Sequence, residues 1–155
     1  MHDLLVPLFK LPEAPASNEQ ALVRAAFSAE RQTAASWVDA EFGPGWASEF
    51  EYAAGLSPVS AYVAIKNGQI VGFACFDAAA KGVFGPMGVS GQWRGRGVGT
   101  ALLFRALRDM RALGYAYAVI GAVGPTGYYE HTVGASPVPD GSPGFLGTLL
   151  KQQNT

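Results

Sequence analysis

One stretch decides how the rest of this chain is interpreted: Gln92-Trp93-Arg94-Gly95-Arg96-Gly97-Val98-Gly99-Thr100. An apolar run at Val83–Val89 precedes it, and an amphipathic helix pattern over 101–113 follows it. The pattern therefore predicts a strand, a glycine loop and a helix N-terminus in succession. Unpaired backbone N–H groups and the positive end of a helix dipole meet at such a junction, which makes it a site for an anion such as phosphate.

Length and composition limit the kinds of protein that this chain can be. The 155 residues correspond to one domain, and an apolar content of 49% leaves no room for a long disordered region. A net charge of −1 gives no electrostatic reason to bind nucleic acid or an anionic membrane. No signal peptide is recognisable and no apolar run approaches the roughly 18 residues of a membrane span, so we expect a cytoplasmic protein.

Changes in hydrophobic period predict the remaining elements. Helices are expected over 17–40, 46–54, 101–113 and 128–133, the first of them with a capping box from Ser17 to Gln20. Strands are expected over 4–8, 60–66, 69–77, 83–89, 115–123 and 145–151. Asn67-Gly68 predicts a hairpin turn, and Gly85-Pro86 predicts a break in strand pairing. The prediction is an α/β domain with a mixed sheet, in which Cys75 is a buried apolar residue.

The glycine spacing of the loop distinguishes between three known motifs. A P-loop needs Lys followed by Ser or Thr after its last glycine, whereas Thr100 follows Gly99 directly. The dinucleotide fingerprint Gly-x-Gly-x-x-Gly fails from Gly95 and from Gly97, because Thr100 and Leu102 occupy the third glycine position. The third motif, Arg-x-x-Gly-x-Gly, is met by Arg94, Gly97 and Gly99.

With this motif the chain resembles the GNAT superfamily of acyl-CoA N-acetyltransferases, whose loop reads (Gln/Arg)-x-x-Gly-x-(Gly/Ala). A second resemblance is the aromatic-Tyr pair Tyr128-Tyr129 on a short helix pattern that ends at Gly134. Two family features are missing. The strand Val83–Val89 has no carboxylate, and 121–127 contains no asparagine.

The resemblance implies a fold: one acetyltransferase-like domain over 1–155, with a mixed, mostly antiparallel sheet of six to seven strands. Helices flank this sheet, which is splayed at the strand before the glycine loop. A homodimer is also a family expectation. No metal is expected.

The resemblance also implies that acetyl-CoA is the co-substrate, and it assigns residues to that role. The backbone of the loop would hold the pyrophosphate of coenzyme A, through Arg94, Gly95, Arg96, Gly97, Val98, Gly99 and Thr100. The strand at Met87, Gly88 and Val89 would lie along the pantetheine arm. Tyr129 would protonate the departing thiolate, because a phenol with a pKa of ~10 is protonated at pH 7.

The general base and the acceptor stay open at this point. Five residues could take the proton of the amine, as could a solvent relay: Glu49, Glu51, Asp77, Glu130 and His131. The acceptor is expected to be a primary amine of a small molecule. Four aromatic residues of the first two helices are expected to border its pocket: Trp37, Trp46, Phe50 and Tyr52.

Two other functions fit the same glycine loop. A non-catalytic acyl-CoA-binding or sensing domain would need no general base, which agrees with the missing strand carboxylate. A phosphate-binding module for another nucleotide would use the same backbone amides.

Overall fold

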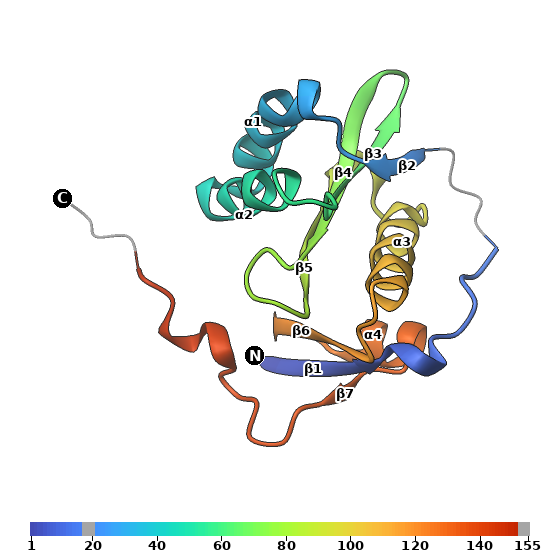
Figure 1. The fold of residues 1–155 in the computed structure, drawn as a ribbon, viewed down its shortest axis with the longest axis vertical. Coiled ribbons are helices and arrows are strands. Elements are labelled where there is room, and N and C mark those ends of the chain that lie inside the picture. Colours follow the sequence, from blue (N-terminus) through green and yellow to red (C-terminus); the bar gives the residue numbers. More distant parts are fainter. Residues whose placement is uncertain (17–20, 152–155) are drawn as a thin grey trace.

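Within the part of the chain that the structure describes, seven strands form one mixed sheet in the order β2-β3-β4-β5-β6-β1-β7 (Figure 1). The structure is a computed structural model and describes residues 1–16 and 21–151. All neighbouring strands are antiparallel except β5 and β6. The strands are β1 His2–Pro7, β2 Leu22–Ala25, β3 Ala61–Lys66, β4 Gln69–Phe76, β5 Val83–Val89, β6 Tyr117–Val123 and β7 Ser136–Pro137.

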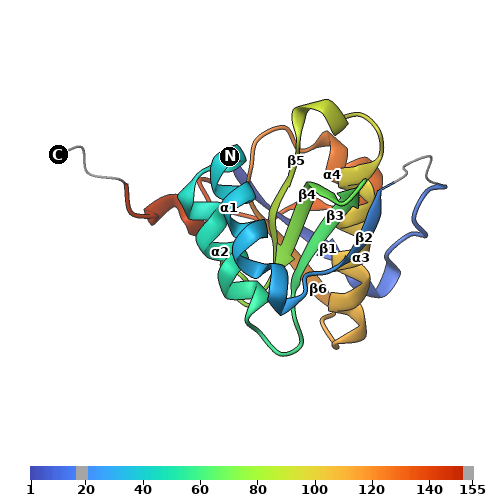
Figure 2. The same ribbon diagram turned by 90° about the horizontal axis from the view of Figure 1, so that it is seen from above.

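Helices cover both faces of this sheet (Figure 2). They are α1 Arg31–Phe42, α2 Pro44–Ala54, α3 Val98–Ala112 and α4 Gly127–Val133, and four short 3₁₀ turns are η1 Leu8–Lys10, η2 Ser28–Glu30, η3 Gly91–Trp93 and η4 Phe145–Thr148. The apolar side of α3, which includes Leu102 and Leu107, packs with Phe76 and Phe84 on one face of the sheet. On the other face, Phe50 of α2 packs with Phe73. The predicted fold class, a mixed sheet flanked by helices, is confirmed.

The hairpin between β3 and β4 forms at the predicted turn. Asn67 has φ 52° and Gly68 has φ 73°, which are the two positive φ angles that a type I′ turn requires. The paired strands place Val63 opposite Phe73 and Ala61 opposite Cys75, and all four side chains belong to one buried cluster.

Strands β5 and β6 run together for two residue pairs and then separate (Figure 1). The pairs are Val83 with Val119 and Phe84 with Ile120. Directly after them, Gly85 has φ 117°, and the register between β4 and β5 shifts by one residue. Gly85-Pro86 is therefore a β-bulge that bends β5 away from β6. The predicted break in pairing and the predicted splay are confirmed.

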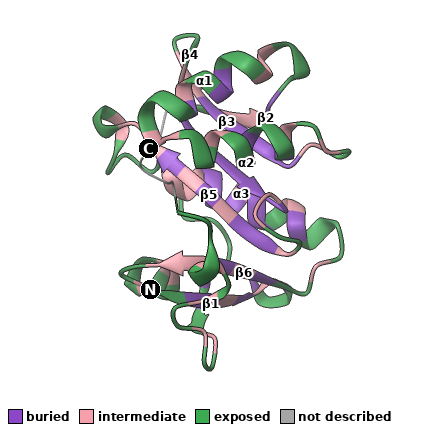
Figure 3. Cartoon of the chain, turned by 90° about the vertical axis from the view of Figure 1, so that its left-hand side faces the viewer, coloured by how far each residue is buried: buried purple, intermediate pink, exposed green. Residues whose placement is uncertain are grey.

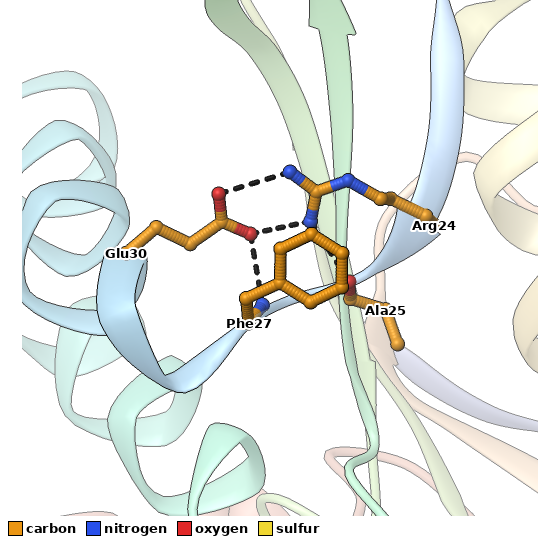
Figure 4. A network of polar contacts seen from close by, with 4 residues as sticks. All are labelled: Arg24, Ala25, Phe27 and Glu30. Atoms are coloured by element: carbon orange, nitrogen blue, oxygen red, sulfur yellow. Dashed lines mark hydrogen bonds and ion pairs between the residues drawn. The ribbon is translucent and has the colours of Figure 1, made fainter.

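The expected helix over 17–40 is wrong in its first half. Residues 17–20, which hold the expected capping box, lie outside the described residues, and Leu22–Ala25 is a strand paired with β3. The helix begins only at Arg31. Glu30 fixes this boundary, because its carboxylate binds the Arg24 guanidinium at 2.9 Å and accepts the Phe27 N–H at 2.8 Å (Figure 4). Cross-strand pairing with β3 thus overrides the helical periodicity.

The expected strand over 145–151 is also wrong. Phe145–Thr148 is a 3₁₀ turn, and the last strand is the two-residue β7 beside β1. The buried carboxylate of Asp3 accepts the Phe145 N–H at 2.9 Å, so that amide is not available to a neighbouring strand. Strand β1 ends at Pro7, one residue before the expected end of that strand, because proline has no N–H for the ladder.

Of the described helices, α3 is the longest with 15 residues, and none is long and apolar enough to cross a membrane.

Candidate active site

The glycine loop delivers the chain into α3 with its first amides free. Gly95 has φ 75° and Gly97 has φ 86°, so both adopt backbone conformations that favour glycine. Gly97 is the residue before α3, and the first α-helical bond of α3 runs from Ala101 N–H to Gly97 O at 3.0 Å. No described side chain caps the amides of Val98, Gly99 and Thr100. These uncapped amides and the helix dipole are the features from which the sequence predicts an anion site.

Two arginines lie at the rim of this loop, and both are exposed. Arg94 turns back toward the sheet, where its Nε donates a hydrogen bond to Val89 O at 3.2 Å. The Arg96 guanidinium lies over the Trp93 ring, 5.0 Å from the ring centre. Neither forms an ion pair with a described carboxylate, so both add uncompensated positive charge beside the free amides.

Strand β5 presents an open edge next to the glycine loop. The Ser90 N–H donates to Val71 O on β4 at 2.9 Å, and amides alternate in direction along a strand. The amides of Met87 and Val89 therefore point away from β4, toward the gap that the separation of β6 leaves. A Cβ on Gly99 would lie 3.6 Å from Val89 Cγ2. The start of α3 and the open edge of β5 are thus direct neighbours.

Gly88 lies between Met87 and Val89 and has a different role in the packing. It pairs with Phe73 on β4, and its α-carbon faces α1. A Cβ added there would lie 2.8 Å from Phe42 Cε1, which is too close for real atoms. Gly88 therefore allows α1 to pack directly on β5, and its backbone is engaged with β4.

The two tyrosines of α4 reach different surroundings. The Tyr128 hydroxyl forms a 2.6 Å hydrogen bond with Thr100 Oγ1 at the first turn of α3. Tyr129 is half-buried and packs on the same apolar cluster as Met87 and Val89. Burial, followed by the neighbouring Tyr128, raises the pKa of the Tyr129 phenol, so it stays protonated at neutral pH. Its hydroxyl has no hydrogen-bond partner among the described residues.

A cavity of about 350 Å³ opens where β5 and β6 separate, on the face of the sheet that α2 covers. Figure 3 views the molecule from this side. The lining is mostly apolar and includes Trp46 and Glu49 of α2, Val83 and Pro86 of β5, Gly121 of β6, and Leu146 and Leu149 near the C-terminus. Ligand cavities span about 300–1,000 Å³, so this one suits a small molecule.

Only one of the four expected aromatic residues lines this cavity. Trp46 does, whereas Phe50 is fully buried in the core and Trp37 packs against Phe42 and Phe73. Tyr52 is exposed. Leu146 and Leu149 are lining residues that the sequence does not predict. The pattern of their segment indicates a strand, and nothing in its sequence indicates that it folds back over β6.

The structure separates the five candidate bases. Glu49 lies in the cavity, and burial raises the pKa of its carboxyl group. Asp77 is buried in the turn before β5, where its carboxylate accepts the Tyr115 hydroxyl at 2.7 Å and the Gly82 N–H at 2.8 Å. Asp77 therefore has a structural role.

The other three candidates lie away from the cavity. Glu51 is exposed and faces a shallow groove between α1 and α2. Glu130 and His131 are exposed on α4, and the Glu130 carboxylate accepts the Thr126 hydroxyl at 3.0 Å. Glu49 is thus the one carboxylate among these candidates that reaches the gap between β5 and β6.

The burial of Cys75 leaves its thiol without access to the cavity. Cys75 is fully buried, as predicted, and burial followed by the charge of Glu49 raises its pKa well above its usual range. Among residues 1–16 and 21–151, no group of three or more His, Cys, Asp or Glu side chains could hold a metal ion.

The part of the chain that holds these elements matches a known protein family. The model of the acetyltransferase (GNAT) family matches residues 21–131, which include the glycine loop, the open edge of β5 and both tyrosines. The chain belongs to the GNAT acetyltransferase family. The first residues of the match include β2, so the strand that the sequence reasoning missed is part of the family domain. The comparison with curated proteins gave no match.

Solved structures of GNAT proteins share the fold. A GCN5-related glucosamine N-acetyltransferase region of a fungal multi-domain β-N-acetylglucosaminidase superposes with a TM-score of 0.72 at 17% identity, over 88% of this chain and 19% of that chain. A GCN5-related N-acetyltransferase from Sphaerobacter thermophilus gives 0.72 at 22% identity, over 88% and 48%. A GNAT acetyltransferase from Brucella melitensis in complex with acetyl-CoA gives 0.56 at 21% identity, over 72% and 80%. The chain spans less than half the length of the first two.

Proposed function

We propose that this GNAT protein transfers an acetyl group from acetyl-CoA to a primary amine of a small molecule. The observation that supports this most directly is the pairing of two sets of free amides. The amides of Val98, Gly99 and Thr100 are uncapped, and those of Met87 and Val89 face the gap beside β5. One set suits a diphosphate and the other an extended thioester arm, and acetyl-CoA carries both, with the arm attached directly to the diphosphate.

The glycine loop would hold the pyrophosphate through backbone atoms. A side chain at Gly95 or Gly97 would strain the loop, because both have positive φ. Arg94 and Arg96 would strengthen the attraction from the rim without defining its geometry. The solved Brucella melitensis protein, which has the same fold, contains acetyl-CoA, and this supports the same ligand here.

The acetyl group would then lie at the bulge in β5, where a free strand amide can polarise the thioester carbonyl. The amine nitrogen forms a bond to the acetyl carbon, the carbon–sulfur bond breaks, and the nitrogen releases one proton to solvent as it becomes an amide. The thiolate of coenzyme A takes a proton from the Tyr129 hydroxyl, which is protonated and has no competing partner among the described residues. The amine enters from the cavity on the α2 face.

Two measurements test this proposal. Coenzyme A at about 100 times its Kd should stabilise the protein by about 2.7 kcal/mol, which a thermal shift detects, whereas ATP and NAD should give smaller shifts. Acetyl-CoA with a panel of primary amines should release free thiol. A larger shift with ATP or NAD would indicate a module for another nucleotide. A coenzyme A shift without thiol release from any amine would indicate a non-catalytic acyl-CoA sensor.

A further inference from the structure

Glu49 occupies an unusual position in the cavity on the α2 face. Among the described residues that line this cavity, it alone has an ionisable side chain. Its carboxylate makes no hydrogen bond or ion pair with any described residue. The neighbours of Glu49 in the lining include Trp46, Val83 and Pro86, so a carboxylate without a partner stands in an apolar wall. A partly buried carboxylate without a partner loses part of its hydration, and a cationic ligand would offset that loss.

We propose that Glu49 binds the ammonium group of the acceptor and takes its proton, and that the cavity admits small primary amines with an apolar body. This inference rests on the proposed acetyl transfer. It assigns the base to α2, on the face of the sheet that holds the acceptor cavity, and so accounts for the absence of any carboxylate in Val83–Val89.

The proton balance shows what Glu49 would contribute. An amine with a pKa of ~10 is almost entirely an ammonium ion at pH 7, and reaching its neutral form costs about 4 kcal/mol. The ammonium donates one proton to the Glu49 carboxylate, and the freed lone pair attacks the acetyl carbon. Burial raises the pKa of Glu49, which makes its carboxylate a better proton acceptor than an exposed glutamate. Glu49 is half-buried, so it can return the proton to solvent.

The lining also limits the chemical class of the amine. A second ammonium on the ligand would have to lie against the apolar wall of Leu146, Leu149 and Pro86, where no further carboxylate is available among the described lining residues. The volume of about 350 Å³ is at the lower end for ligand cavities. An amine with one ammonium and a compact aliphatic or aromatic body fits both limits.

Few other charges face Glu49. Burial, followed by the charge of Glu49, raises the pKa of Cys75 on β4, so this thiol is neutral at neutral pH. Met1, before β1, lines the same cavity. Among the described residues, its α-amino group forms no ion pair with Glu49. The lining from β5, β6 and η4 contributes no charge. The acidic limb of a pH–rate profile should therefore report Glu49.

The test compares Glu49→Gln with the matched control Glu51→Gln on the exposed side of the same helix. With 2-phenylethylamine as acceptor, E49Q should lower kcat/KM by about 10²-fold at pH 7. The wild-type rate should fall as pH drops through the raised Glu49 pKa, above 4.5, and E49Q should lose this limb. E51Q should retain both the rate and the limb. Equal profiles for E49Q and the wild type would overturn the role of Glu49.

A second arm tests the substrate class and separates the two proposals. Isopentylamine and 2-phenylethylamine should be acetylated with kcat/KM at least 10-fold above spermidine and above a lysine peptide. Preference for spermidine or the peptide would overturn the apolar class. Coenzyme A binding is measured in parallel for each variant. If the wild type does not bind coenzyme A, the proposed function itself is refuted. If the wild type binds coenzyme A and transfers the acetyl group, and E49Q has the same kcat/KM, this inference alone is refuted.

Discussion

At the scale of single residues, the two tyrosines of α4 show how neighbours with the same chemistry acquire different roles. Tyr128 is exposed, and its hydroxyl is engaged with Thr100 at 2.6 Å. Tyr129 is more deeply placed, against the apolar cluster that includes Met87 and Val89, and its hydroxyl has no described partner. The acid must present a proton to the leaving group, so the unengaged phenol is the candidate.

Replacing Tyr129 by Phe should lower kcat about 10²-fold and leave the KM for acetyl-CoA nearly unchanged, because a positioned general acid contributes about 10²–10⁴-fold. Since burial raises the Tyr129 pKa above 10, the wild-type protein should retain the acid up to at least that pH. Steady-state kinetics across pH measures both effects. Tyr128→Phe is the control, and it should change coenzyme A affinity by about 0.5–1.5 kcal/mol through the lost Thr100 bond. An unaltered kcat in Tyr129→Phe at every pH would remove the acid role.

At the scale of elements, the site depends on how α1 and α2 cover β5. Phe42 at the end of α1 lies directly over Gly88, and it packs against Trp46, which lines the acceptor cavity, with ring centres 5.2 Å apart. The glycine at this point of β5 is therefore part of helix–sheet packing. It places α2, and with it Glu49, at the gap between β5 and β6.

Gly88→Ala should destabilise the protein by about 1–3 kcal/mol, because the new methyl group overlaps the Phe42 ring and α1 must move. Urea unfolding followed by circular dichroism measures this change. Combining Gly88→Ala with Phe42→Leu should recover part of the loss by removing the ring. Gly45→Ala, in the first turn of α2 with open space around it, should be neutral or stabilising. Equal effects at Gly88 and Gly45 would contradict the proposed close packing.

At the scale of the whole molecule, Asp3 joins the two ends of the described chain. Its buried carboxylate accepts the N–H groups of Ala122 at 3.2 Å and Phe145 at 2.9 Å. Its backbone binds Val138 and Gly141. These contacts hold the C-terminal segment over β6, where Phe145 and Leu146 pack on Gly121. One wall of the acceptor cavity is therefore attached through β1.

Asp3→Ala should raise the KM for the amine and leave the coenzyme A Kd unchanged, because it frees the segment that carries Leu146 and Leu149. Each amide left without its partner should also cost about 1–3 kcal/mol of stability. Amine titrations, coenzyme A calorimetry and thermal unfolding separate these effects. Asp3→Asn should be milder, because its amide oxygen can still accept one bond. Asp39→Ala on the exposed face of α1 is the control and should change stability by less than about 0.5 kcal/mol. A parallel loss of coenzyme A affinity in Asp3→Ala would argue against a local role.

Much of the fold, and the backbone features behind the proposed coenzyme side of the candidate site, could be predicted from local sequence. Asn67-Gly68, Gly85-Pro86 and the loop over 92–100 each impose their backbone through their own φ angles. The α3 stripe fixes which face of that helix is buried. The coenzyme side of the site follows from these features, because free amides at a helix N-terminus are a property of the chain around that point.

The proposed acceptor side depends on features that only the tertiary structure decided. Strand β2 exists because β3 offers it a pairing edge, and the C-terminal segment becomes a cavity wall because Asp3 takes the Phe145 amide. Glu49 differs from Glu51 only in the direction in which α2 presents it to the gap between β5 and β6. Local sequence sets the backbone conformation. Packing decides which residues from distant segments surround a side chain, and the proposed general-base chemistry depends on those surroundings.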